Sequence, residues 1–400
     1  MNFLSERIRK IPESETLSLV AKANKLRAEG KKVISFAAGE LDFPTPSNII
    51  EETISAIRGG NWKYSPSSGL PDLRKAIAKY VSQKTGVRVS EGNVAVTSGA
   101  KQAIFNTLFS VIDNGDKVIV ISPYWVSYPA MVTLAGGIPV IVDSKQENGF
   151  KISKEDIEAC IKDHNPKAII INSPSNPTGS IYSQEELLEI YESCKKRNIF
   201  IISDEIYSSL VYDGARHFSV LNVAGKITDE ISVIDGMSKS FAMTGWRIGW
   251  LIGASPLVQN VSKMTAQTTS CAVTFIQRGC IKSLLEGDDP SIKWKDELQT
   301  RRDKMVSLIN SSGLVSCHKP AGAFYIWVDV SQILSKKLPS GKIVETSSNL
   351  SEYLIEDGNL IAVPGSAFGR EGFLRFSFAV SMEEIEEGVK RFIQSIKKLN

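Results

Sequence analysis

The stretch Ser232-Val-Ile-Asp-Gly-Met-Ser-Lys-Ser-Phe-Ala-Met-Thr-Gly-Trp-Arg-Ile-Gly-Trp250 organises the predicted fold. It begins as a short β-branched run, passes through a loop that carries Lys239, and reaches Arg247 directly before a second apolar run, 248–252. β-branched and apolar runs of this length are typical of strands. We therefore expect one lysine and one arginine to lie together at the rim of a sheet.

Strands alternate with helices upstream of this stretch. Short apolar runs at 94–97, 117–121, 168–171 and 199–203 are each followed by a loop or helix start with polar residues, and Ser183 begins a helix with a capping box. This alternation indicates a mostly parallel sheet, and such sheets bind ligands beyond the carboxyl ends of their strands. The residues that follow strands, and are therefore expected to converge on one rim, are Lys101, Trp125, Asn176, Asp204, Tyr207 and Lys239.

Lys239 and Arg247 have the chemistry needed to hold pyridoxal 5′-phosphate (PLP). An amine can form a Schiff base with the aldehyde of this cofactor, and a permanently charged guanidinium can meet its phosphate. The turn 98–102 adds backbone N–H groups at the start of a helix, which favour an anion. It contains no G-x-G-x-x-G pattern, so a nicotinamide dinucleotide is not expected. A solvated loop lysine beside a structural arginine remains the alternative.

Other residues suit the ring of such a cofactor and the carboxylate of a substrate. A carboxylate beside the pyridine nitrogen keeps that nitrogen protonated and makes the ring a better electron sink, and Asp204 is the candidate. Asn176 and Tyr207 can donate hydrogen bonds to the phenolic oxygen. Arg375 lies among the apolar residues of 373–378, where a guanidinium needs an anion, either a substrate carboxylate or an internal Asp or Glu.

The segment 238–249, Ser-Lys-Ser-Phe-Ala-Met-Thr-Gly-Trp-Arg-Ile-Gly, closely resembles the lysine motif of class I aminotransferases, which are fold-type I enzymes that use PLP. Asn-Pro-Thr-Gly at 176–179 and Asp-Glu-x-Tyr at 204–207 precede it in the family's order, and the resemblance covers essentially the whole chain. It implies an α/β fold in which helices flank a mostly parallel seven-stranded sheet. The implied domains are a large PLP-binding one, 46–290, and a smaller α+β one made of 1–45 and 291–400.

The resemblance also implies a role for each candidate residue. The residues implied in cofactor binding, with Lys239 also catalytic, are Ser98, Gly99, Ala100, Lys101, Trp125, Asn176, Asp204, Tyr207, Lys239, Arg247 and Tyr64. Those implied in substrate binding are Gly39, Lys101, Trp125, Asn176 and Arg375. Tyr64 would reach the phosphate in the other subunit of a homodimer, and Trp125 would stack on the pyridine ring. Taken alone, Gly39 is a turn glycine, Tyr64 an interface aromatic and Trp125 a core residue.

The activity implied by the resemblance is transfer of the amino group of L-aspartate to 2-oxoglutarate, giving oxaloacetate and L-glutamate, through a PLP Schiff base on Lys239. Lys101 stands where related aspartate aminotransferases meet the distal carboxylate, and Thr16 is a second candidate for that contact. Prephenate or aromatic amino acid aminotransferases are the alternatives, and Pro12 stands where some prephenate-using relatives have a lysine. A PLP-binding transcription regulator is disfavoured, because the family pattern starts within the first ~40 residues and leaves no room for a DNA-binding domain.

Composition argues against several other classes of protein. The 47 basic and 44 acidic residues leave a net charge of +3, which is too small an excess for a nucleic-acid footprint. No apolar stretch approaches the ~20 residues of a membrane span, and no secretory signal is expected at the start. Five scattered cysteines fit a reduced, cytoplasmic compartment. Three histidines without metal-ligand spacing are expected at surface or capping positions, with no metal site.

Overall fold

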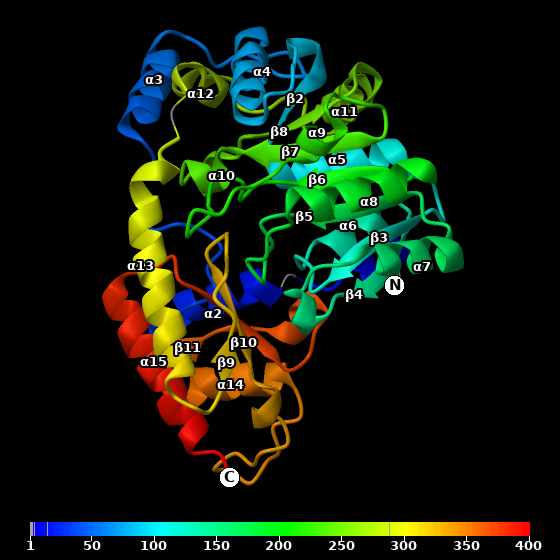
Figure 1. Cartoon of the computed structure of the whole chain (residues 1–400). Coiled ribbons are helices and arrows are strands. Elements are labelled where there is room, and N and C mark those ends of the chain that lie inside the picture. The colour runs from blue at the N-terminus through cyan, green and yellow to red at the C-terminus, as the bar shows by residue number, and fades with distance from the viewer. Residues whose placement is uncertain (1–2, 4, 14, 288) are drawn as a thin grey trace.

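The computed structural model describes residues 3, 5–13, 15–287 and 289–400, and its larger region is a seven-stranded sheet covered by helices (Figure 1). The strand order is β2-β8-β7-β6-β5-β3-β4; β8 runs antiparallel to both of its neighbours, and the other pairs are parallel. The strands are β2 (Val94–Thr97), β3 (Lys117–Ser122), β4 (Ile138–Asp143), β5 (Ala168–Asn172), β6 (Phe200–Asp204), β7 (Ile231–Gly236) and β8 (Gly249–Gly253). The predicted α/β class with a mostly parallel seven-stranded sheet is confirmed.

Alternate side chains of the strands build two cores, one on each face of the sheet. In β5, Ile169 and Ile171 enter one core while Ala168 and Ile170 enter the other. Burial on both faces explains why these strands read as continuous apolar runs. The helices of the first face are α4 (Pro71–Thr85), α7 (Lys154–His164), α8 (Gln184–Lys196), α9 (Val220–Ala224) and α12 (Thr274–Glu286), with α3 (Ser47–Arg58) packed on α12. Those of the second face are α5 (Ala100–Val111), α6 (Tyr128–Leu134) and α11 (Ser255–Thr268).

A second region combines the N-terminal segment with the last quarter of the chain. Four strands form an antiparallel sheet in the order β12-β13-β10-β9, and β1 pairs in parallel with β11. Phe36 packs on Phe376, and Phe376 packs on Phe392, so both ends of the chain share one core. The remaining elements are α1 (Glu6–Arg9), α2 (Glu15–Ala28), β1 (Ile34–Ser35), α13 (Ser291–Asn310), β9 (Ser316–Cys317), β10 (Tyr325–Asp329), α14 (Ser347–Gly358), β11 (Leu360–Ile361), β12 (Val363–Pro364), β13 (Phe373–Ser377) and α15 (Met382–Lys397).

The segment that follows β6 packs with this second core. Tyr207, Leu210 and Tyr212 are buried among its residues. The backbone N–H of Tyr212 donates to the carbonyl of Ala321 at 3.0 Å, and the N–H of Ala323 donates to the carbonyl of Leu210 at 2.9 Å. The two regions are therefore joined directly behind the end of β6. Domain boundaries at 45/46 and 290/291 remain a prediction.

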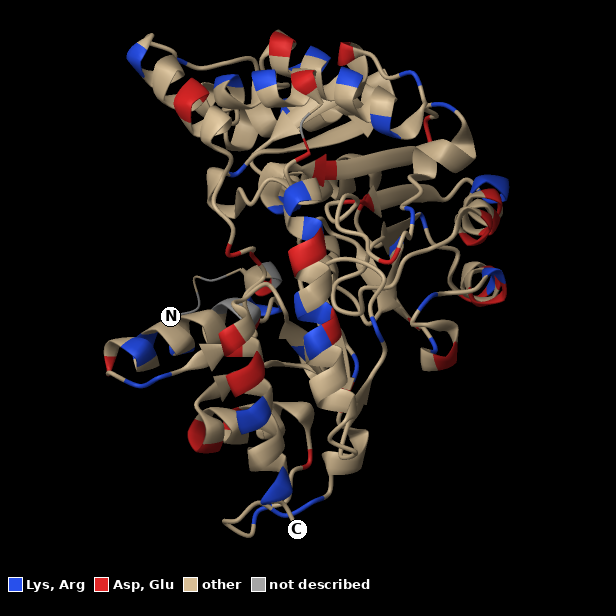
Figure 2. Ribbon diagram, turned by 60° about the vertical axis from the view of Figure 1, so that its left-hand side comes forward, with Lys and Arg blue, Asp and Glu red and all other residues tan. Residues whose placement is uncertain are grey.

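Local features follow from the sequence with one difference. Ser183 caps α8 as predicted, because its Oγ accepts the backbone N–H of Glu186 at 3.2 Å. Lys239, expected in a loop, instead lies in the short helix α10 (Met237–Ser240). Both signs of charge, Lys and Arg as well as Asp and Glu, occur along the outer helices (Figure 2). Within the described ranges, none of the helices combines the length and apolarity that crossing a membrane demands.

Candidate active site

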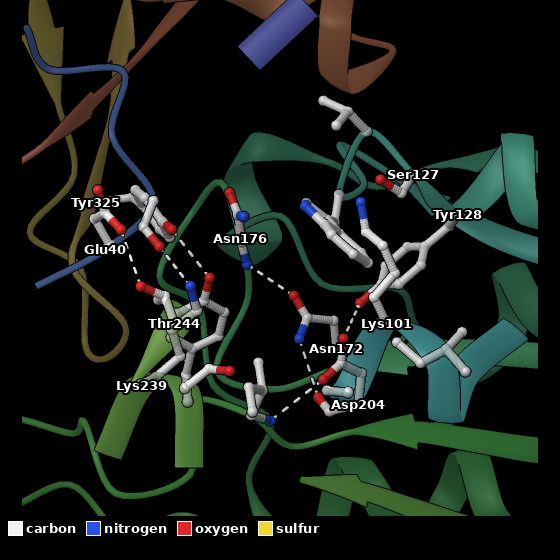
Figure 3. Close-up of a pocket in the computed structure, with 18 of the residues that line it drawn as sticks. Glu40, Lys101, Ser127, Tyr128, Asn172, Asn176, Asp204, Lys239, Thr244 and Tyr325 are labelled. Carbon is white, nitrogen blue, oxygen red and sulfur yellow. Dashed lines mark hydrogen bonds between the residues drawn. The ribbon is translucent and has the colours of Figure 1, made fainter. Parts of the chain in front are cut away.

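A cavity of about 530 Å³ lies between the carboxyl edge of the seven-stranded sheet and the second region (Figure 3). Parallel strands end at the same edge of a sheet, so the residues that follow them meet there. The sequence candidates that line this cavity are Gly39, Ala100, Lys101, Trp125, Asn176, Asp204, Tyr207, Lys239, Arg247 and Arg375. The structure thus brings these side chains together, and the role of each remains a prediction at this point.

Asp204 lies deep in the cavity. It is the last residue of β6, and only 4% of its surface is exposed. Its Oδ2 accepts a hydrogen bond of 2.6 Å from the hydroxyl of Tyr128, and its Oδ1 accepts one of 3.2 Å from the backbone N–H of Ile206. Burial raises the pKa of Asp204 to about 6, and the two hydrogen bonds oppose that rise. Asp204 is therefore a desolvated carboxylate that is still mostly ionised at neutral pH.

Lys239 projects from α10 into the same cavity. Its Nζ donates to the carbonyl oxygen of Gly39. Burial, and after it the positive charge of Arg375, lowers the pKa of Lys239 to about 8. The Nζ atom lies 5.8 Å from the ring centre of Tyr207 and 5.7 Å from that of Phe324. In these surroundings the amine is neutral, and hence nucleophilic, in a larger fraction of molecules than an exposed lysine is.

Arg247 and the first turn of α5 form a cradle suited to an anion. A Cβ on Gly99, whose φ is 85°, would stand 2.4 Å from Nη2 of Arg247, and a Cβ on Gly249 would stand 2.4 Å from the amide nitrogen of Ala100. The two glycines therefore let the helix start, β8 and the guanidinium pack closely. The amides of a first helical turn have no acceptor inside the helix, so this end favours a phosphate or carboxylate.

Ser98 and Gly99 lie behind this cradle rather than on the cavity wall. The amide of Ser98 donates to the side chain of Gln102 at 2.7 Å, and its carbonyl accepts a bond of 3.3 Å from Arg247. These bonds anchor the guanidinium to the turn. The amides left for an anion are those of the following residues, Ala100 and Lys101.

Arg375 forms the opposite end of the cavity, where only 2% of it is exposed. Its Nη1 donates to Oδ1 of Asn176 at 3.0 Å, and its Nη2 donates to the carbonyl of Ala37 at 2.7 Å. The guanidinium lies 4.3 Å from the ring centre of Tyr325 and 5.1 Å from that of Phe368. Both hydrogen-bond acceptors are neutral oxygens, so these contacts leave the buried positive charge uncompensated. The structure thus favours an anion from outside over the internal Asp or Glu considered above.

Lys101 and Trp125 stand side by side on the sheet side of the cavity. The Nζ of Lys101 lies 4.8 Å from the ring centre of Trp125, and the indole meets Tyr128 edge to face at 5.3 Å. Burial, and after it the charge of Arg247, lowers the pKa of Lys101. The aromatic contact holds a cation at the cavity wall.

Two polar residues on the sheet side are not singled out by the sequence. Tyr128 bonds Asp204, and its position three residues after Trp125 is a weak local signal. Asn172 bonds the carbonyl of Asp204 at 3.0 Å and the amide of Asn176 at 2.8 Å. A stronger signal exists for Asn172, because it ends β5 as Asp204 ends β6 and the two are paired in register.

Two further polar residues come from outside the large sheet. Tyr325 on β10 shares a hydrogen bond of 3.0 Å with the hydroxyl of Tyr207. The carboxylate of Glu40 accepts one of 2.9 Å from Thr244. Neither residue follows a strand of the large sheet, so the pattern that predicts the rim could not have found them.

Tyr64 stands apart from the cavity of its own chain, and 86% of its surface is exposed. That position is compatible with the expected reach into another subunit as well as with an ordinary interface aromatic. The role of Tyr64 stays a prediction.

His217 does not occupy a surface or capping position, so that expectation is wrong. Its side chain is only 7% exposed and bonds Oε2 of Glu205 at 3.0 Å. The other oxygen of Glu205 accepts hydrogen bonds from the hydroxyls of Ser203 and Ser219, both at 2.9 Å, and from the amide of Val220 at 3.0 Å. This carboxylate fastens segment 217–220 to the end of β6, directly beside Asp204.

Comparisons with known proteins agree with this geometry. The family model described as aminotransferase class I and II matches residues 31–392. A probable aspartate/prephenate aminotransferase of Aquifex aeolicus is 39% identical over 398 residues, which are 99% of each chain. An aspartate aminotransferase of Streptomyces avermitilis is 37% identical over 390 residues, which are 97% of this chain and 95% of that protein.

Solved structures show the same fold, and they confirm the expected fold-type I architecture. The aspartate aminotransferase of Thermus thermophilus with maleate has a TM-score of 0.92 and 34% identity, covering 99% of this chain and 100% of that one. The aspartate aminotransferase of Thermotoga maritima has a TM-score of 0.89 and 39% identity, covering 98% and 99%. With the family model and the relatives both spanning nearly the whole chain, this protein belongs to the aminotransferase class I and II family.

Proposed function

We propose that this aminotransferase uses PLP to exchange the amino group between L-aspartate and 2-oxoglutarate, with oxaloacetate and L-glutamate as products. The observation that carries the proposal is the composition of one cavity: the amine of Lys239, the carboxylate of Asp204, and the two cations Lys101 and Arg375. Two cations suit donors and acceptors that each have two carboxylates. The relatives named aspartate aminotransferase support this choice of donor.

The cavity fits PLP group by group. Arg247 and the start of α5, packed closely because of Gly99, suit the phosphate. Asp204 suits the pyridine nitrogen, and the aromatic wall at Trp125 suits the ring. When bound, PLP supplies a sink for the electron pair that remains on the substrate Cα after its proton leaves.

Two hydrogen-bond donors of the cavity suit the phenolic oxygen of PLP. Asn176 uses its Oδ1 to accept the bond from Arg375, which leaves its Nδ2 to donate. Tyr207 lines the cavity and shares its hydroxyl with Tyr325. We assign both side chains to the phenolic oxygen.

Lys239 moves the proton in this proposal. With a pKa of about 8, its amine is partly neutral near neutral pH. It can therefore act first as the base that accepts the proton of the substrate Cα and then as the acid that gives this proton back later in the reaction. The bond to Gly39 fixes Nζ at one end of the cavity. Asp204 keeps its negative charge deep inside, where it favours the protonated ring nitrogen.

Arg375 and Lys101 select the substrate. The planar guanidinium of Arg375 can take an α-carboxylate with two parallel hydrogen bonds, and that anion balances a charge which its present contacts do not balance. Lys101 reaches the distal carboxylate from the sheet side. The other sequence candidate for this contact, Thr16, has a side chain that lies outside the described residues.

Prephenate is the second candidate for the amino acceptor. Relatives named aspartate/prephenate aminotransferase, such as the one from Aquifex aeolicus, favour it. Pro12, standing where some prephenate-using relatives have a lysine, argues the other way. Turnover with prephenate and aspartate distinguishes these cases.

We further propose a homodimer in the cytoplasm. The exposed Tyr64 supports the dimer, because a ring that is 86% exposed in one chain is free to contact a second chain. The five free cysteines support a reducing compartment. Sedimentation of the purified protein measures its oligomeric state. If a Tyr64→Phe variant retains PLP as tightly as the wild type, Tyr64 does not contact the cofactor of the other subunit.

Borohydride reduction of the PLP-saturated protein tests the function. We expect a stable adduct on the peptide that contains Lys239, its loss in Lys239→Ala, and its retention in the exposed control Lys263→Ala. A panel of amino donors with 2-oxoglutarate then tests specificity. Faster turnover of alanine or phenylalanine than of aspartate would exclude the dicarboxylate assignment.

A further inference from the structure

Tyr128 is a buried phenol that touches the most buried acid of the cavity. It is the first residue of α6, 3% of its surface is exposed, and its hydroxyl donates to Oδ2 of Asp204 at 2.6 Å (Figure 3). A short O–H···O⁻ bond is a charge-assisted one, and such bonds are roughly twice as strong as bonds between neutral groups. Tyr128 therefore acts on a residue to which the proposed function gives a charge.

We infer that Tyr128 is a positioning residue, which keeps the Asp204 carboxylate ionised and directed at the ring nitrogen of the bound cofactor. This inference rests on the proposed use of PLP. Tyr128 bonds Asp204 and packs on Trp125, which lies three residues before it. A single side chain would therefore hold both the carboxylate and the indole in place.

The need for such a residue follows from the burial of Asp204. Burial raises the pKa of Asp204 to about 6, and the hydrogen bond from Tyr128 is the largest effect that lowers it. Of the charged groups nearby, Glu205 raises this pKa and Lys239 lowers it. Without the hydroxyl, the pKa of Asp204 moves upward toward neutral pH, and the carboxylate loses its charge there.

The aromatic ring of Tyr128 has a separate task. It packs edge to face on Trp125, with an angle of 81° between the planes, and the indole in turn carries the cation of Lys101. A Tyr128→Phe substitution keeps this packing and removes only the hydroxyl. The substitution therefore separates the effect on Asp204 from an effect on the shape of the cavity.

Tyr212 provides a matched control. Its hydroxyl is also buried and also donates at 2.6 Å, but to the neutral carbonyl of Ala323 outside the cavity. Tyr212→Phe removes a buried hydrogen bond of the same length without touching an acid. Any general cost of losing a buried phenol appears in both variants.

The test measures the affinity of the cofactor-free protein for PLP and for its carbocyclic analogue, in which CH replaces the ring nitrogen. Near neutral pH, Tyr128→Phe should bind PLP roughly ten-fold more weakly than the wild type. Because Asp204 ionises again at higher pH, the difference should shrink as the pH rises to about 9. Affinity for the analogue should be unchanged, and Tyr212→Phe should match the wild type for both compounds.

A double variant completes the test. In an Asp204→Asn background, Tyr128→Phe should cause no further loss of PLP affinity, since its target is gone. A loss that is equal for PLP and the analogue, or independent of pH, would show that the hydroxyl only supports the local structure. A wild-type protein that binds neither compound would refute the proposed function, and this inference with it.

Discussion

The two walls of the cavity are built in different ways. On the wall made by the seven-stranded sheet, Asp204 is held from within that wall, by the hydroxyl of Tyr128 and the side-chain amide of Asn172. On the wall made by the antiparallel sheet, Arg375 donates to Asn176 across the cavity and to Ala37 from the N-terminal segment. The first wall depends on the topology of one sheet. The second depends on three segments that lie far apart in the sequence.

This difference suggests a division of labour. Changes in the sheet wall, apart from Lys101, should alter folding stability and the hold on the cofactor, whereas changes at Lys101 and in the facing wall should alter substrate affinity. Four predictions test this division, starting with the largest expected effect.

Glu205→Ala should weaken the sheet wall most. The substitution removes the acceptor of His217, Ser203, Ser219 and Val220 behind Asp204, and each buried group left without its hydrogen-bond partner typically costs about 1–3 kcal/mol. Urea unfolding of the cofactor-free protein measures the loss. The exposed control Glu345→Ala should change stability by less than about 0.5 kcal/mol. If both variants unfold alike, Glu205 does not stabilise this wall.

Arg375→Gln should weaken substrate binding with little effect on cofactor uptake. Two charge-assisted hydrogen bonds to the α-carboxylate are lost, so KM for aspartate should rise by about 100-fold. Steady-state kinetics measure KM, and absorbance of bound PLP measures uptake. Arg375→Lys keeps the positive charge but lacks the two parallel N–H donors of a guanidinium, so it should give an intermediate KM. Loss of PLP in parallel with KM would contradict the division between the walls.

Lys101→Met should have a smaller and more selective effect. The hydrophobic stem remains against Trp125 while the charge is lost, so KM for aspartate should rise by about ten-fold. Donors without a distal carboxylate, such as alanine, serve as the internal control and should be unaffected. An equal rise for both donors would mean that Lys101 supports the cavity without reading the substrate.

The smallest expected effect is a shift in the pH dependence of the reaction between Lys239 and PLP. It links the two walls because Arg375 on the facing wall influences Lys239. The rate at which Lys239 attaches to PLP should rise with pH and level off above about 8, because only the neutral amine reacts. Arg375→Gln removes a positive charge that lowers the pKa of Lys239, so its profile should move to higher pH. Borohydride trapping at short times measures the rate. Lys101→Met, whose charge is not among the causes of this shift, should leave the profile in place.

The sheet wall is the part of the site that sequence patterns can predict. Consecutive parallel strands end at one edge, so knowing that Asp204 ends one strand and that Lys239 follows another is enough to bring them together. The same reasoning applies to Asn172, which ends β5. The pattern of strand ends does not predict Tyr128, because the role of Tyr128 depends on where a side chain points from the start of a helix.

The facing wall needs information that local patterns do not contain. Arg375 could be recognised as a buried cation in want of an anion, but not as a neighbour of Ala37, since that contact joins residues 338 positions apart. Tyr325 gives no local signal for meeting Tyr207. The burial of His217 depends on Glu205 in the same way, and isolated histidines carry no mark of such pairing.

The close approach of Gly99, Gly249 and Arg247 sets a limit on redesign of this enzyme. A methyl group at Gly99 would collide with the guanidinium of Arg247, and one at Gly249 would collide with the helix start. The parts of the anion cradle can therefore pack this closely only because both residues lack a side chain. Engineers who adapt the cavity to bulkier amino acids therefore have to keep both glycines. At Gly249 the obstacle is the backbone of the helix start, so even alanine is too large there.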